Sequence, residues 1–160
     1  MEYLEAIGKI IKDFMNLEDG QIYFFNQMYI VPNDKRLYVC IGYQGDNTIS
    51  NIKENKEDLQ EFTTIKQKQV SIIIYSYGYE AIDRKEEIIQ ALNSNESENI
   101  QSLLGFHIGN LPISEENTSE EDGTKVLNKY NLLFNIIVGK RNNKTTTYYD
   151  NSQFLLTKNN

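Results

Sequence analysis

VSIIIYSYGYEAIDRKEEIIQAL, residues 70–92, changes its hydrophobic period at Gly78. Before the glycine, apolar side chains alternate along the chain, which predicts a β-strand over residues 63–77. After the glycine, apolar residues recur every three or four positions, which predicts an amphipathic helix over residues 79–92. We therefore expect a strand that runs directly into a helix at the centre of the fold.

The residues before this stretch predict one helix, one strand and one loop. Apolar residues spaced as in an amphipathic helix predict an N-terminal helix within residues 1–16, with Phe14 as the last member of its apolar stripe. Residues 36–43 are rich in aromatic and β-branched side chains and predict a strand. Residues 46–62 are polar and charged, so we expect a long loop there.

The residues after this stretch predict a second short helix and the last strands. Asn95 and Glu98 have the spacing of a capping box, which predicts a helix that ends at Gly105. We expect an acidic loop over residues 114–124 and a long strand over residues 126–139. The remaining elements are a polar turn over residues 140–144 and, within residues 145–160, a hairpin strand and a tail.

The chain has the size and composition of one folded domain, residues 1–160. A chain of this length buries about 68 to 70% of its unfolded surface. Hydrophobic residues make up 39% of it and charged residues 24%, as in ordinary globular proteins. The order of elements predicts an α+β fold, with a mostly antiparallel sheet of about four strands and the helices packed on one of its faces.

Charge and cysteine content narrow the class of partner. Sixteen Lys and Arg stand against 23 Asp and Glu, a net charge of -7, which argues against a general nucleic-acid-binding protein. Protein partners are expected instead. The single cysteine, Cys40, excludes an intrachain disulfide. Glu2 and Glu5 stand where a signal peptide is positive, and no apolar run reaches the roughly 20 residues that span a bilayer, so no membrane partner is expected.

The sequence offers no set of residues for catalysis. His107 is the single histidine and has no Ser or Cys motif beside it, and the nine glycines do not form a phosphate-binding loop. The acidic residues from Glu115 to Asp122 lack the spacing of a calcium loop, so we interpret them as a solvated loop or as a charged contact with another subunit. We expect neither an enzyme nor a cofactor.

Several features in this order resemble the neck and tail terminator proteins of long-tailed phages and prophages. They are Phe25-Asn26-Gln27 followed by Pro32, the pair Thr63-Thr64 at the start of a long alternating strand, Tyr77-Gly78-Tyr79-Glu80-Ala81 leading into a helix, a segment around Gly109 to Pro112, and the final strand from Tyr130 to Val138. The resemblance covers residues 20–140 approximately. The junction from strand through Tyr-Gly into helix is its most specific part.

The resemblance implies a structural role in a virion. Proteins of that family form a ring, commonly a hexamer, that ends the tail tube and joins it to the head connector. It implies as partners further copies of the chain, the tail tube protein (with the sheath in a contractile tail) and the head connector or completion protein, while DNA passes through the lumen without sequence-specific binding. The protein would be made in the host cytoplasm and end up in the neck. The candidate interface residues are Phe25, Asn26, Gln27, Pro32, Thr63, Thr64, Tyr77, Tyr79, Glu115, Glu116, Glu120, Glu121 and Asp122.

Two other functions remain open at this point. The first is another ring of the same assembly, such as a head completion or stopper protein. The second is a small acidic inhibitor or immunity protein that covers a basic toxin surface as a one-to-one complex.

Overall fold

The fold is described from a computed structural model of the chain. The structure describes residues 2–25, 32, 34–56, 59–109, 111–112 and 114–145.

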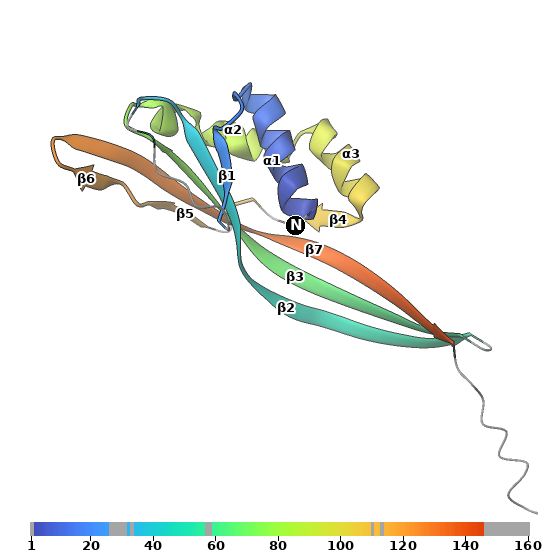
Figure 1. Ribbon diagram of the computed structural model, residues 1–160. Coiled ribbons are helices and arrows are strands. Elements are labelled where there is room, and N and C mark those ends of the chain that lie inside the picture. Colours follow the sequence, from blue (N-terminus) through green and yellow to red (C-terminus); the bar gives the residue numbers. More distant parts are fainter. Residues whose placement is uncertain are drawn as a thin grey trace, which may run out of the picture.

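These residues form three helices and seven strands (Figure 1). In chain order the elements are α1 (Glu2–Met15), β1 (Ile22–Phe24), β2 (Tyr38–Lys56), β3 (Leu59–Ser76), α2 (Glu80–Leu92), α3 (Asn95–Leu104), β4 (Phe106–Ile108), β5 (Ser114–Asn117), β6 (Glu120–Asp122) and β7 (Lys125–Thr145).

The strands form one mixed sheet in the order β1-β2-β3-β7-β4, with β5 and β6 also paired to β7. β1 is parallel to β2, and the other pairs are antiparallel. The α+β class is therefore confirmed, but the expected sheet of about four mostly antiparallel strands is wrong. The difference arises because β1, β4, β5 and β6 have only three or four residues each, too few to show a hydrophobic period.

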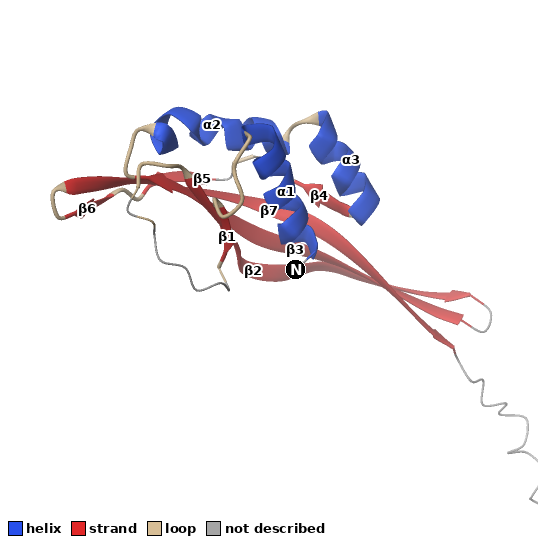
Figure 2. Cartoon of the chain, turned by 45° about the horizontal axis from the view of Figure 1, so that its top comes forward, coloured by secondary structure: helices blue, strands red, loops and turns tan. Residues whose placement is uncertain are grey.

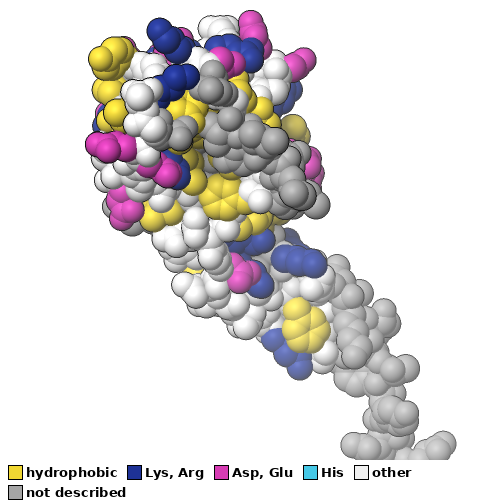
Figure 3. Space-filling model, turned by 60° about the vertical axis from the view of Figure 1, so that its left-hand side comes forward, with side chains coloured by type: hydrophobic (Ala, Val, Ile, Leu, Met, Phe, Trp, Pro, Cys, Tyr) yellow, Lys and Arg dark blue, Asp and Glu magenta, His cyan; other side chains and the backbone are white. Residues whose placement is uncertain are grey.

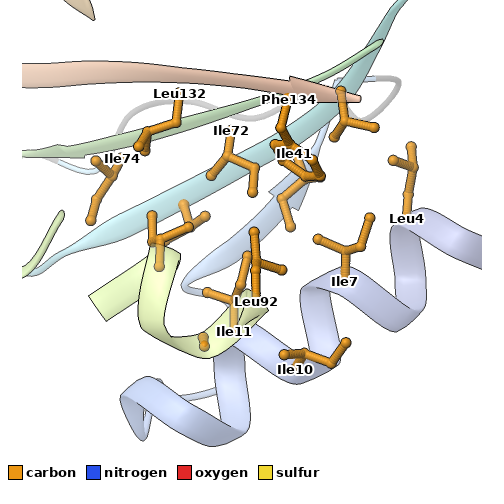
Figure 4. Close-up of a cluster of buried hydrophobic side chains, with 14 of the residues drawn as sticks. Leu4, Ile7, Ile10, Ile11, Ile41, Ile72, Ile74, Leu92, Leu132 and Phe134 are labelled. Carbon is orange, nitrogen blue, oxygen red and sulfur yellow. The ribbon is translucent and has the colours of Figure 1, made fainter. Parts of the chain in front are cut away.

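The three helices lie over one face of the sheet and enclose the main core with it (Figure 2). Apolar side chains from α1 and α2 meet those of β2, β3 and β7 (Figure 4). Ile7, Ile11, Ile41, Ile72 and Ile74 are all fully buried there. Within the described residues, no helix is long and apolar enough to cross a membrane.

The N-terminal helix is confirmed as α1, with one correction to its buried face. Leu4, Ile7 and Ile11 are buried as the apolar spacing predicts. Phe14, however, is 42% exposed, and Met15 occupies the core position instead at 2% exposed. The spacing of the sequence allows either residue to end the stripe, and the packing of α1 against the sheet selects Met15.

A second, smaller cluster lies on the other face of the sheet. Tyr38, Cys40 and Tyr75 are each only 2% exposed there, and the rings of Tyr38 and Tyr75 stack with centroids 5.7 Å apart. Cys40 thus has the expected role of a small buried hydrophobic residue.

The predicted strand-to-helix junction is confirmed between β3 and α2. The Ser76 hydroxyl donates to the Gly78 carbonyl (2.8 Å) and accepts from the Ala81 amide (3.1 Å), so it satisfies one of the free donors at the start of α2. The Asn128 side chain donates to the same Gly78 carbonyl (2.8 Å). A Cβ at Gly78 would lie 3.2 Å from the Lys35 carbonyl oxygen, so a side chain there would press on the backbone of the loop before β2.

The short helix predicted to end at Gly105 is confirmed as α3, but its N-cap is one residue earlier than expected. The Ser94 hydroxyl accepts from the Ser97 amide at 3.2 Å, so Ser94 is the N-cap and the Asn95 capping box is wrong. Gly105 ends the helix in the left-handed conformation, with φ of 70°.

Three of the expected connecting segments are in fact parts of strands. Residues 46–56 and 59–62 belong to the paired strands β2 and β3. Most of the expected acidic loop, residues 114–117 and 120–122, is β5 and β6. The expected turn over residues 140–144 is the end of β7, which continues to Thr145. The expected hairpin strand after that point lies outside the described residues.

Gly42 in β2 allows an aromatic ring to lie directly on the sheet. A Cβ at this position would be 2.1 Å from Cγ of Phe25, so Gly42→Ala should displace the ring and lower the free energy of unfolding by about 1–3 kcal/mol. Chemical denaturation measures this change. Gly45→Ala in the same strand is the matched control, because a Cβ there meets nothing within 4 Å. If the two variants were equally stable, the contact between Gly42 and the Phe25 ring would not contribute to the stability of the fold. Phe25→Ala combined with Gly42→Ala should recover part of the loss.

Candidate protein interface

A three-stranded arm extends from the helix-covered part of the molecule (Figure 1). The arm comprises residues 44–56 of β2, 59–69 of β3 and 139–145 of β7; the remaining described residues are called the body. β3 is its central strand and pairs with β2 on one side and β7 on the other. Among the described residues, no strand pairs with the outer edge of β2 beyond residue 43 or with that of β7 beyond residue 138. The arm therefore presents two faces and two edges to its surroundings.

One face of the arm is basic. Cross-strand partners share a face of a sheet, and Lys66 and Lys68 pair with Val138 and Ile136, which belong to the main core. The two lysines therefore lie on the helix side. Lys53 and Lys140 lie on this face too, because they pair with Phe62 and Thr64, which are in phase with Lys66 and Lys68 along β3. Figure 3 shows dark blue groups gathered along the arm.

The lysines of this face are held by neighbouring side chains. Lys66 Nζ is 3.1 Å from a carboxylate oxygen of Asp46. Lys68 Nζ lies 4.8 Å from the centre of the Tyr43 ring, and Lys53 Nζ lies 5.9 Å from that of Phe62. Lys66 is therefore paired with a carboxylate, whereas Lys53 and Lys68 are positioned by uncharged rings.

The opposite face of the arm has a short apolar stripe. Ile52 and Ile65 lie on it, and Ile137 at the adjoining edge of the body continues it; Ile52 and Ile137 are 45% and 37% exposed. Arg141 and Glu61 form an ion pair on the same face, with 3.4 Å between Nε and the carboxylate oxygen. An exposed isoleucine stripe on a sheet with open edges is typical of a surface that contacts another protein.

A hollow of about 540 Å³ lies where the basic face meets α1. Its lining includes Tyr3, Thr64, Lys66, Lys68, Val138 and Lys140. The Tyr43 hydroxyl, near Tyr3 and under Lys68, is buried and has no hydrogen-bond partner among the described residues. Burial, together with the neighbouring Tyr3, raises the pKa of Tyr43. A neutral phenol and several ammonium groups suit an acidic side chain as the occupant.

One group of acidic residues lies at the other end of the molecule, around β5, β6 and the start of α2. Glu115 forms an ion pair with Lys85 of α2, and Glu120 forms one with Lys129 of β7 at 2.9 Å. Glu116 and Glu121 are exposed and form no ion pair within the described part of the chain. We call β5, β6 and the first turn of α2 the acidic end. Part of it is visible as magenta groups on the body in Figure 3.

The predicted interface residues do not form one surface. Thr63 and Thr64 lie on opposite faces of the arm, Phe25 packs on Gly42, and Pro32 is half-buried. Tyr79 is 76% exposed at the start of α2, at the acidic end with Glu115, Glu116, Glu120 and Glu121; Asp122 belongs to β6 by its backbone. Lys125 Nζ lies 5.6 Å from the centre of the half-buried Tyr77 ring. Asn26 and Gln27 lie outside the described residues.

The sequence-based interpretation missed the basic face of the arm. Ile65-Lys66-Gln67-Lys68-Gln69-Val70 has the period-two alternation of a strand, with lysine in place of the apolar residue. Following the period outward from Val70 would have placed both lysines on the core-facing side. The lysines gave no apolar signal, so the continuation of the core-facing side into the arm was not recognised from the sequence.

No family model matches the chain, and no curated protein matches it. The resemblance to tail terminators therefore depends on the residues quoted above. Within the described part of the chain, no group of three or more His, Cys, Asp or Glu side chains is arranged to hold a metal ion. His107 is exposed in β4.

Asp34 anchors the aromatic cluster on the face opposite the helices. Burial alone would raise the pKa of Asp34, but hydrogen bonds from the Tyr38 hydroxyl (2.9 Å) and Arg36 Nε (2.9 Å) outweigh it, and the pKa lies below its ordinary value. The pKa of Tyr38 is raised, mainly by burial and secondly by its hydrogen bond to Asp34. The ionised carboxylate is thus favoured in the folded state.

Asp34→Asn should make stability less dependent on pH. A carboxyl with a lowered pKa contributes stability above the unfolded pKa of about 4, and this contribution is lost as the pH falls through the folded value. The variant should unfold at lower urea concentration than the wild type at pH 7, and the two midpoints should approach each other as the pH falls from about 4 through the folded pKa of Asp34. Asp13→Asn on α1 is the control and should leave the midpoint close to that of the wild type at pH 7. A gap between Asp34→Asn and the wild type that stayed constant with pH would contradict the role of the carboxylate.

Proposed function

We propose that this protein is a structural component of a phage neck, forming a ring that ends the tail tube and joins it to the head connector. One observation carries the proposal: β3 runs through Gly78 directly into α2 at one end and forms the centre of an uncovered arm at the other. The junction is the most specific part of the resemblance to tail terminators. The arm is a surface without an evident use in a protein that acts alone.

The shape of the molecule supports a ring. The basic face of the arm and the acidic end lie apart on the elongated molecule and differ in chemistry (Figure 1). Copies that join through two unlike surfaces make a heterologous contact, which gives a closed ring when the rotation between neighbours closes. The resemblance gives six as the expected number of copies.

The charge of the chain supports a channel for DNA. Six copies at -7 each carry a net charge of about -42, and a lumen lined by part of it repels phosphates and lets the genome slide. The partners are then the tail tube protein, the sheath in a contractile tail, and the head connector. The protein needs no cofactor, catalyses no reaction, and resides in the virion neck after synthesis in the host cytoplasm.

Deleting the coding sequence from a phage that encodes it tests the proposal. Electron micrographs should show full heads separated from tails, and the tails should vary in length because nothing ends their polymerisation. Joined virions with tails of normal length would overturn the proposal. Separate tails of uniform length beside heads that have lost DNA would instead identify a stopper ring.

The mass of the purified protein separates the ring from the inhibitor alternative. A hexamer has a mass of about 110 kDa, six times the 18.6 kDa of the chain. Light scattering over a range of protein concentrations should detect it in solution or after addition of tail tubes. A monomer that remains a monomer with tail tubes, and that binds a basic protein one to one, would favour the inhibitor.

A further inference from the structure

Charge is divided unevenly between the arm and the body. Residues 44–69 and 139–145, which are the arm together with the two residues that join β2 to β3, contain seven Lys or Arg and five Asp or Glu, a net charge of +2. Residues 1–43 and 70–138 contain eight Lys or Arg and 17 Asp or Glu, a net charge of -9. Two copies with a net charge of -7 repel each other in most orientations, and the repulsion falls when the arm of one approaches the body of the other.

The basic hollow is the place on the arm where a neighbour is best accommodated. Lys66, Lys68 and Lys140 surround it, and Asp46 is the one acidic side chain placed on that face among the described arm residues. At about 540 Å³ the hollow has room for several side chains. It lies beside α1, so an occupant would touch the arm and the body together.

The acidic end has the matching chemistry. Glu116 of β5 and Glu121 of β6 form no internal ion pair among the described residues. They pair with Asn131 and Val126 of β7, so Glu121 lies on the helix side of the sheet and Glu116 on the opposite side. Val126, which pairs with Glu121, is exposed, and so is Tyr79 at the start of α2. A carboxylate beside an exposed apolar residue, as Glu121 is beside Val126, fits a hollow lined by lysines, Tyr3 and Val138.

We propose that the acidic end of one copy docks in the basic hollow of the next copy, and that this contact joins neighbours head to tail. The contact explains how the basic face of the arm avoids binding DNA, since a neighbouring copy covers it. Its role in closing a ring rests on the function proposed above. The contact itself is a property of two copies and can be measured without a ring.

Two variants, each lacking one half of the contact, test it. Lys66→Gln with Lys140→Gln removes charge from the hollow, and Glu116→Gln with Glu121→Gln removes charge from the acidic end. Each variant alone should associate at least tenfold more weakly than the wild type at low salt. An equimolar mixture retains one intact hollow and one intact acidic end, so it should form a dimer of about twice 18.6 kDa and grow no further. Sedimentation velocity in about 50 mM and 1 M salt measures both, and high salt should weaken the dimer.

Matched controls change the same charge elsewhere on the molecule. Lys9→Gln with Lys35→Gln and Glu5→Gln with Asp13→Asn alter exposed residues of the body, so both should associate as the wild type does. Circular dichroism should show that every variant is folded. Carbodiimide cross-linking of the wild type should join Lys140 of one copy to Glu116 or Glu121 of another.

The outcomes separate this contact from the proposed function. A ring that forms equally well with all variants would overturn the contact and leave the neck function standing. A mixture that dimerises, from a wild type that grows into open filaments, would support the contact and count against the ring. If the mixture stays monomeric, or if Lys66→Gln with Lys140→Gln weakens binding to duplex DNA and leaves self-association unchanged, the contact is wrong.

Discussion

The structure depends on the unbroken register between β3 and β7. The two strands pair from Ser76 and Asn128 in the body to Leu59 and Thr145 at the end of the arm, without a bulge. Side chains alternate strictly between the two faces of a regular strand. The residues of β3 and β7 that face the core in the body therefore determine which residues of both strands lie on the same face in the arm. Val70 sits on the helix side for the same geometric reason as Lys66.

This register produces one sheet with two environments. The helices cover the part in which Val70, Ile72 and Ile74 face them, and the sheet continues beyond the helices with both faces exposed. β2 follows the central pair only with two irregularities, between Tyr43 and Gly45 and between Thr48 and Ser50. Bulges increase the local twist of a strand, which makes the open edge of β2 a poor template for uncontrolled pairing.

The sequence predicts the covered half of the molecule and not the exposed half. α1, α2, α3 and the apolar parts of β2, β3 and β7 are readable because one face is buried and leaves a hydrophobic period. Residues 46–56 show no hydrophobic period, because both faces of the arm contact solvent. The arm is stabilised by cross-strand pairs such as Asp46 with Lys68. The parallel pairing of β1 has no local signal, since three residues suit many structures. The basic hollow combines residues of α1, β3 and β7, so only the register reveals it.

The net charge of the chain opposes unspecific self-association through the arm. Long strands with open edges and exposed isoleucines favour association with other copies in many registers, most of which would lead to irregular aggregates. A net charge of -7 opposes all of these encounters, and the excess of lysine on one face of the arm relieves that opposition in one orientation. In the contact proposed above, the same charges that keep the chains apart favour a head-to-tail arrangement, which closes into a ring when the rotation between neighbouring copies closes.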